Sequence, residues 1–419
     1  MKNNITQVTL KNGMKVMLKE IHTAPIISSW IWYKVGSRDE PTGKTGISHW
    51  TEHMMFKGTK TFPNGVLDKA ISRDGGRWNA ATSRDSTRYF ETMPADKIDL
   101  ALRLEADRMQ NTVFTEKEVA SERTVIISER EGSENEPTFL LGEAVQHAAF
   151  RVHPYHHEII GDKADLLTIT RDDLYNHYKT YYVPNNAVLC LAGDFDTKAM
   201  LKRIKALYEK IPKGKTPPRI VRPEPPQKGE VRLSVEGPGE TAFTQIAYHV
   251  TNATHPDYFA LDVLVSLLNG SSGLSYKTAR LYRALVDKEL AVDVYGWFES
   301  TIDPTLYRIT ITHRPDKTPE QALAVFDDEI KKIQNELITD EEITRAVKQA
   351  KAVFAYGSEN ITHQAFWMGY TSMFADYSWY VNYVKNLAKV TPQDVQRVAQ
   401  EYLQPSNRVV GVYIPKGRG

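Results

Sequence analysis

Cysteine is almost absent from the 419-residue sequence, which contains only Cys190. A single cysteine excludes a disulfide framework within the chain and a zinc site built from several thiolates. Cys190 lies in the apolar stretch VLCLA at 188–192, which is typical of a buried strand rather than of a reactive nucleophile. Catalytic or metal-binding chemistry is therefore expected from other side chains.

Long apolar runs are missing as well. No stretch approaches the ~18 consecutive apolar residues of a membrane-spanning helix. The first ten residues also lack the apolar core of a signal peptide. We therefore expect no membrane partner and a cytoplasmic protein, or a periplasmic one if a signal peptide has been removed.

Neither sign of charge is in excess, because 53 Lys and Arg residues face 52 Asp and Glu residues and the formal net charge is +1. This balance gives no reason to expect a nucleic-acid partner. The chain is 41% hydrophobic and 25% charged, which is the profile of a globular protein. Its length exceeds one ordinary core, so we expect two domains or more.

The sequence does contain the motif His-Trp-Thr-Glu-His at 49–53, within an uninterrupted stretch at 47–57 that predicts a helix. One helical turn separates His49 from His53, which places both imidazoles on one face, as a zinc ion requires. Glu52 lies beside them in the H-x-x-E-H order of the inverzincins. The alternative is an ordinary helix with two hydrogen-bonded histidines and a solvated glutamate.

A second helix is predicted after Thr115, which forms a capping box with Glu118. Glu122 and Glu129 follow, seven residues apart. Two helical turns return nearly to the same face, so both carboxylates are expected to point the same way. Catalytic zinc needs a third protein ligand, and this helix offers two candidates.

The surroundings of these two carboxylates leave two interpretations open. Val125 and Ile126 are expected on the buried side of the helix, where paired acids are costly unless a cation meets them. Arg123 and Arg130 favour the alternative of an exposed, salt-bridged face. The cluster His-Pro-Tyr-His-His at 153–157 is interpreted as a loop, at most one that lines a substrate site.

An internal repeat relates residues 169–188 to residues 390–409 at a constant offset of 221. The period is that of a domain rather than of a short solenoid. A Pro- and Lys-rich stretch follows the first copy. We therefore predict a metal-bearing N-terminal domain at 1–215, a linker at 216–229 and a homologous C-terminal domain at 230–419. The second half lacks H-x-x-E-H, although it repeats the first half. The fold alone therefore does not require the motif, which favours a functional site in the first half.

Taken together, these motifs resemble the pitrilysin and insulysin family of zinc metallopeptidases, closest to processing-peptidase-like bacterial zinc subunits. Glu129 follows His53 by 76 residues, as the third ligand does in that family. The resemblance implies one Zn²⁺ per chain bound by His49, His53 and Glu129, with Glu52 as the general base and Glu122 supporting a ligand. It also implies that an extended peptide binds along an edge strand at Asn79 and Ala80.

For the fold we expect α+β architecture, with two homologous halves that form a clamshell around a peptide cavity. Each half is expected to be a mainly antiparallel sheet covered by helices. One departure from the family concerns an Arg and a Tyr, seven residues apart, for which this chain has Val286 and Asp293. We therefore expect a zinc-bearing subunit of a heterodimer whose homologous partner supplies that pair. The alternatives are a self-sufficient homodimeric peptidase and a non-catalytic core or scaffold subunit.

Overall fold

The computed structural model describes residues 5–270 and 276–417 of the chain. These residues form two compact units, each built from three segments. The first unit comprises Met1–Arg130, His157–Val221 and Gly357–Tyr377, and the second comprises Glu131–His156, Arg222–Tyr356 and Ser378–Gly419. The units therefore differ from the sequence halves 1–215 and 230–419 by an exchange of two segments.

The sheet of the first unit has the strand order β1-β2-β6-β3-β5-β4. All neighbouring strands are antiparallel except β2 and β6. Asn12 and Gly13 lie in the hairpin turn that joins β1 to β2, where Gly13 has a φ of 90°. In spatial order the strands are β1 (Ile5–Thr9), β2 (Lys15–Glu20), β6 (Ala187–Gly193), β3 (Ile26–Tyr33), β5 (Thr87–Pro94) and β4 (Arg77–Thr82).

The sheet of the second unit has the order β7-β11-β8-β10-β9, with one parallel pair, β7 and β11. Its connectivity repeats that of the first sheet without β1. Both sheets are thus mainly antiparallel and have the same topology, which confirms the predicted α+β fold with two homologous halves. The strands are β7 (Val231–Pro238), β11 (Arg408–Lys416), β8 (Phe243–Val250), β10 (Thr305–His313) and β9 (Ala291–Trp297).

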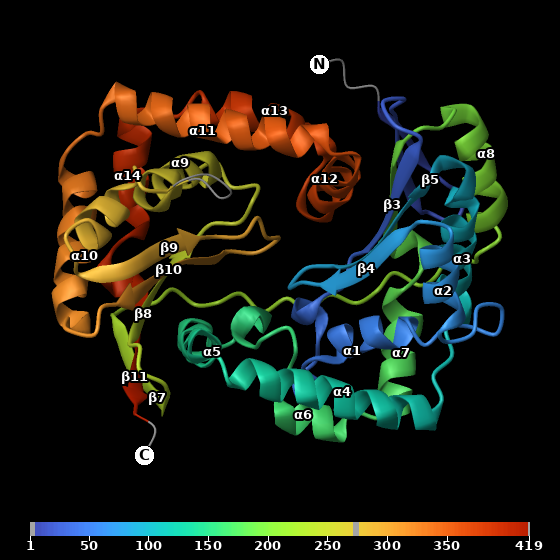
Figure 1. Ribbon diagram of the computed structural model, residues 1–419, viewed down its shortest axis with the longest axis horizontal. Helices are drawn as coiled ribbons and strands as arrows, with labels where there is room; N and C mark the ends of the chain where they lie inside the picture. Colours follow the sequence, from blue (N-terminus) through green and yellow to red (C-terminus); the bar gives the residue numbers. More distant parts are fainter. Residues whose placement is uncertain (1–4, 271–275, 418–419) are drawn as a thin grey trace. The chain divides into compact units, whose positions relative to one another are not determined.

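Helices cover both sheets (Figure 1). The first unit contains α1 (Ile47–Met55), α2 (Val66–Arg73), α3 (Ile98–Asn111), α6 (Lys163–Thr168), α7 (Arg171–Tyr181), α8 (Thr197–Tyr208) and α12 (Ile361–Phe374). The second unit contains α5 (Pro137–Ala149), α9 (Tyr258–Asn269), α10 (Pro319–Asn335), α14 (Pro392–Tyr402) and all but the first residue of α13 (Tyr377–Leu387). Two long helices, α4 (Glu116–Glu134) and α11 (Asp340–Glu359), run from one unit into the other.

The exchanged segments each supply a helix to the sheet of the other sequence half. In the first unit α12 packs on β3, where the Phe366 ring lies 5.3 Å from the Trp32 ring. In the second unit α5 packs on β11 through Leu141 and Val145. An apolar helical face predicts that a helix covers a sheet but not which of two similar sheets it covers. The exchange therefore could not be read from the pattern.

The repeated segments fold alike in detail. Asn186 donates its side-chain amide to the carbonyl oxygen of Tyr181 at 2.8 Å, where α7 leads into β6. Asn407 makes the same bond to Tyr402 at 2.8 Å, where α14 leads into β11. Both helices also begin with a Thr and Asp capping box. The repeat inferred from the sequence is thus a structural duplication.

The second unit offers a test of pH-dependent stability at Asp262, a half-buried residue of α9 that accepts a hydrogen bond from the Tyr383 hydroxyl at 2.5 Å. Burial raises the pKa of Asp262 to about 6. In the unfolded state the pKa of an Asp carboxyl is about 3.9. Because the pKa in the folded state is higher, the contribution of Asp262 to stability is fully present below about pH 3.9 and is lost as the pH rises through about 6. Asp262→Asn is therefore expected to be more stable than the wild type by about 1–2 kcal/mol at pH 8 and no more stable at pH 4.

Thermal unfolding of both proteins at pH 4 and pH 8 measures this difference. Asp328→Asn, which removes an exposed carboxylate from α10, is the control and should leave the stability unchanged at both pH values. Equal stability of Asp262→Asn and the wild type at pH 8 would show that the Asp262 carboxylate is well solvated.

Candidate metal centre

The helix α1 carries both histidines of the motif. Gly46 precedes it in the left-handed conformation, with φ of 85°, and the helix buries Trp50 and Met54 completely. The neighbouring face, about 100° round the helix, presents His49 and His53, which are partly buried and whose ring centroids lie 4.6 Å apart. The predicted helix is confirmed, although it ends at Met55 rather than at residue 57. Its apolar side anchors the helix and its polar side is left for the site.

The helix α4 carries the two glutamates. The backbone N–H of Glu118 donates to Thr115 Oγ1 at 3.1 Å, as the predicted capping box requires. The Glu122 side chain is 5% exposed and the Glu129 side chain is 46% exposed. Ile126 is buried as expected. The expectation for Val125 was wrong, since it is 47% exposed and lies at the edge of the buried face.

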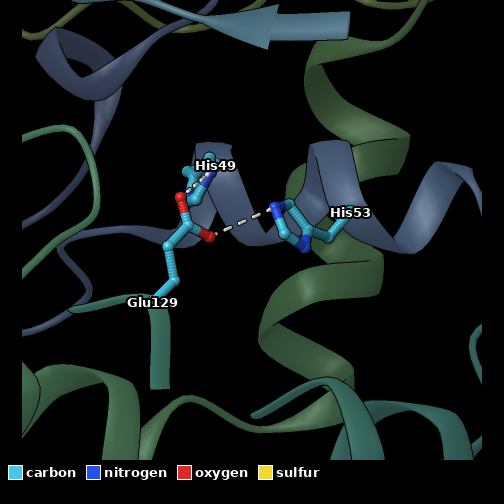
Figure 2. Close-up of side chains that lie close together, drawn as sticks. All are labelled: His49, His53 and Glu129. Atoms are coloured by element: carbon cyan, nitrogen blue, oxygen red, sulfur yellow. Dashed lines mark ion pairs between the residues drawn. The ribbon is translucent and has the colours of Figure 1, made fainter. Parts of the chain in front are cut away.

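Glu129 meets the two histidines through different oxygens (Figure 2). Its Oε1 lies 3.8 Å from His49 Nε2 and its Oε2 lies 3.7 Å from His53 Nε2. Zinc binds such donors at about 2.0–2.2 Å, so the three ligand atoms of a tetrahedral site lie about 3.4 Å apart. The observed spacing is close to that value, and a small rotation of the partly exposed carboxylate closes the difference. The donor set fits a zinc ion with one coordination position left for water.

The protonation of the two histidines differs. Burial lowers the pKa of His49 to about 3, and the neighbouring His53 acts in the same direction. For His53, burial also favours the neutral form, but the hydrogen bond to Glu122 and nearby carboxylates outweigh it and raise the pKa. His53 Nδ1 lies 2.8 Å from Glu122 Oε1. When Nδ1 donates this bond, Nε2 keeps its lone pair for a metal.

Glu122 is held from its other side by Lys57, whose Nζ forms an ion pair with Glu122 Oε2. Burial alone would raise the pKa of Glu122, but His53 and Lys57 together lower it. The sequence predicted Glu122 near the site but missed Lys57. The available signal was its position four residues after His53, one further turn along the chain.

The Glu122 contact predicts a measurable effect on metal affinity. Glu122→Gln is expected to weaken zinc binding about 10–100-fold, because a neutral amide holds the His53 tautomer and basicity less well than a carboxylate. Zinc titration in competition with a chromophoric chelator measures this change. Glu116→Gln removes the same charge from the exposed first turn of α4 and should change the affinity less than twofold. Equal affinities of the two variants would exclude a supporting role for Glu122.

Glu52 projects from α1 beside the histidines and is 7% exposed. Thr82 Oγ1, at the end of β4, donates to Glu52 Oε2 at 2.5 Å. Burial raises the pKa of Glu52, and the bond from Thr82 opposes that shift. No sequence pattern indicates that Thr82 pairs with Glu52. The result is a carboxylate close to the candidate ligands with an elevated proton affinity, as a general base needs.

Within the described residues, the strand β4 lies at one edge of its sheet and pairs with β5 alone, in agreement with the prediction of an edge strand. Asn79 is exposed and Ala80 is partly buried. The Asn79 side-chain oxygen accepts the backbone N–H of Ala80 at 2.9 Å. Rotation of the Asn79 side chain would free this N–H for an added strand.

His153 and His157 have structural roles. His153 Nε2 lies 3.2 Å from Asp303 Oδ2 in the second unit, and His157 Nε2 lies 2.9 Å from Glu40 Oε2 in the first. Both histidines are at most 5% exposed. The stretch between them forms a short 3₁₀ turn at Pro154–His156. A substrate-lining role is therefore not supported for His153 or His157.

Among the helices of the described residues, none is long and apolar enough to cross a bilayer. Two family models match consecutive parts of the chain. Residues 15–163 match the model described as Insulinase (Peptidase family M16), and residues 168–350 match the Peptidase M16 inactive domain. The first match contains His49, Glu52, His53 and Glu129.

Similar proteins agree with these matches. The zinc protease PqqE of Helicobacter pylori is 30% identical over 95% of this chain and 90% of its own. A probable mitochondrial-processing peptidase subunit beta of Arabidopsis thaliana is 28% identical over 82% of this chain and 66% of its own. The crystal structure of a protease from Helicobacter pylori superposes with a TM-score of 0.94 at 29% identity, over 98% of this chain and 99% of the other. Sequence, topology and the arrangement of the centre thus show that the chain belongs to the insulinase family of peptidases, family M16.

Proposed function

We propose that the protein is a zinc-dependent endopeptidase that hydrolyses peptides or unfolded protein segments. The observation that carries the proposal is the convergence of His49 Nε2, His53 Nε2 and the Glu129 carboxylate, with Glu52 buried alongside. The relative PqqE is named as a zinc protease, which supports the same chemistry. All of these side chains belong to the first compact unit.

Each residue then has a distinct role. A zinc ion held by His49, His53 and Glu129 would supply Lewis acidity to a water molecule and to the scissile carbonyl. Glu52 accepts the proton of the attacking water and passes it to the leaving amine. Thr82 holds one oxygen of Glu52 and leaves the other for that transfer. Glu122 orients His53.

The edge strand β4 is proposed to bind the substrate. An extended peptide added at Asn79 and Ala80 would pair with backbone groups, so most of its affinity would not depend on sequence. Because β4 ends at Thr82, which bonds to Glu52, the same strand connects substrate binding with the general base. This arrangement favours extended segments over folded proteins as substrates.

A homologous subunit is proposed as the partner. Val286, at the end of the π-helical turn Tyr282–Val286, and Asp293, in β9, occupy the positions expected for an Arg and a Tyr. Neither an isopropyl group nor a carboxylate can stabilise the oxyanion that forms during peptide hydrolysis. The relative from Arabidopsis thaliana is named as a subunit, which supports the idea of a paired enzyme.

Cleavage of an internally quenched unstructured peptide tests the proposal. The zinc-loaded chain would be assayed alone and mixed with a homologous subunit that has the Arg and Tyr but not H-x-x-E-H. Activity only in the mixture, abolished by a chelator and restored by zinc, supports the heterodimer. Equal activity of the chain alone would favour the homodimeric peptidase. Zinc binding without cleavage in any combination would favour a scaffold subunit.

A further inference from the structure

The ligands come from two helices that are distant in sequence, and a third segment contacts both of them. This segment, residues 157–169, is here called the bracing segment, and it includes α6. On the α1 side, Thr45 donates its backbone N–H and its hydroxyl to Asp165 Oδ2 at 2.9 and 2.7 Å. The Asp162 backbone N–H donates to Thr45 Oγ1 at 2.8 Å. These bonds fix the residues that lead directly into α1.

The first turn of α1 is held further by a buried carboxylate. Glu40 accepts the backbone N–H groups of Gly46 and Ser48, both at 2.8 Å, and its Oε2 lies 2.9 Å from His157 Nε2 in the bracing segment. A carboxylate at a helix N-terminus satisfies free N–H groups and is favoured by the helix dipole. A Cβ atom on Gly46 would lie 2.4 Å from the Ile160 carbonyl oxygen. The contact leaves little room for the helix start to shift.

On the α4 side, Arg123 connects the same segment to both helices. Its guanidinium donates to the carbonyl oxygens of Leu167 and Ile169 at 2.5 and 2.7 Å. It also lies over the Trp50 ring of α1, 5.2 Å from the centroid. The carbonyl groups at the end of α6 have no partners within the helix and carry its negative dipole end, so a guanidinium suits them. Arg130, also on α4, donates to the Gly161 carbonyl oxygen at 3.1 Å.

We propose that Arg123 is a positioning residue that sets the distance between Glu129 and the two histidines. The proposal rests on the zinc site proposed above. Glu129 lies nearly two turns after Arg123 on the same helix, so a shift or rotation of α4 moves its carboxylate directly. Ligand distances in a zinc site tolerate changes of only a few tenths of an ångström. Arg123 therefore acts through α4 and does not touch the metal or the substrate.

Cobalt(II) substitution provides a probe of the ligand geometry that is independent of peptide cleavage. Arg123→Met keeps an unbranched side chain of similar length but loses the two carbonyl bonds and the charge over Trp50. We expect the visible d–d spectrum of the cobalt-loaded variant to change and its zinc affinity to fall about 10–100-fold, as for other supporting contacts. Arg123→Lys retains the charge and one donor, so it should recover part of the affinity.

The matched control is Arg219→Met, since Arg219 donates to Lys34, Asp39 and Asn186, which lie outside α1 and α4. This variant should keep the wild-type spectrum and affinity even where its melting temperature falls as far as that of Arg123→Met. An unchanged spectrum and affinity in Arg123→Met would overturn the proposal. Equal losses in both variants would also overturn it, because they would show a general effect of stability.

A metal-free measurement separates this proposal from the zinc site itself. If the wild type binds neither cobalt nor zinc, the proposed function fails, and hydrogen exchange of the metal-free proteins decides the role of Arg123. Faster exchange of amides at 116–130 and 47–55 in Arg123→Met than in Arg219→Met would support the positioning role. The same exchange in both variants would refute it.

Discussion

Replacing Glu52 by glutamine is expected to reduce the rate of peptide hydrolysis about 10²–10⁴-fold, which is the usual contribution of a positioned general base. Zinc should still bind to this variant. Glutamine has nearly the same shape and still accepts a hydrogen bond from Thr82 through its amide oxygen. It cannot take a proton from water. The loss should therefore appear in kcat rather than in the binding of the peptide.

Two measurements make this prediction specific to Glu52. Steady-state cleavage of the quenched peptide gives kcat and KM, and metal analysis gives the zinc content of the same sample. A parallel Glu131→Gln variant removes an acid from α4 outside the proposed centre and should retain full activity. Residual activity of Glu52→Gln within tenfold of the wild type would assign the proton transfer to another group.

Loss of His53 is expected to have the largest effect on the metal. His53→Ala removes one of three proposed ligands and leaves the Glu122 carboxylate without its imidazole partner. We expect zinc affinity to fall at least about 1000-fold, which is roughly 4 kcal/mol of binding free energy. The stabilisation that zinc gives to the folded state should fall with it, because a ligand stabilises only the state that binds it.

Thermal unfolding with and without saturating zinc measures that stabilisation. The wild type should melt at a higher temperature with zinc, whereas His53→Ala should melt at the same temperature in both conditions. His22→Ala is the control, because His22 is an exposed histidine of the same unit that pairs with Glu20 and Asp194. A zinc-dependent rise in His53→Ala equal to that of the wild type would remove His53 from the site.

Local patterns in the sequence predicted the parts of the fold that depend on short-range geometry. The spacing of His49 and His53 placed both on one face of α1, and the seven-residue spacing of Glu122 and Glu129 placed both on one side of α4. The duplication was visible because capping boxes and the asparagines before β6 and β11 recur at fixed positions. In each case a few neighbouring residues determine the structure.

Contacts between distant residues were not predictable in this way. Thr82 holds Glu52, yet nothing in the sequence around Thr82 indicates this partner. Lys57 holds Glu122, and only its position four residues after His53 placed it near the site. Glu40 is equally ordinary in the sequence but caps α1 from six residues before Gly46. The exchange of α5 and α12 between the sheets has the same cause, since two similar sheets present equivalent apolar faces. Contacts between residues that are distant in sequence depend on the complete tertiary structure.

Val125 shows a limit of helical periodicity itself. The residues three and four positions after a given residue are both its neighbours on a helix. They lie on either side of the line through that residue parallel to the helix axis. Ile126, four after Glu122, is buried, whereas Val125, three after it, is 47% exposed. The width of the buried face is decided by what packs on the helix, and the sequence of α4 does not record it.

The proposed function depends on a zinc ion held by His49, His53 and Glu129. Anomalous diffraction from crystals of the zinc-loaded protein, recorded on both sides of the zinc absorption edge, tests it most directly. We predict one peak per chain, about 2.0–2.2 Å from Nε2 of each histidine and from a Glu129 carboxylate oxygen. A peak elsewhere would contradict the account. So would the absence of any peak in crystals grown from protein that binds one zinc per chain in solution.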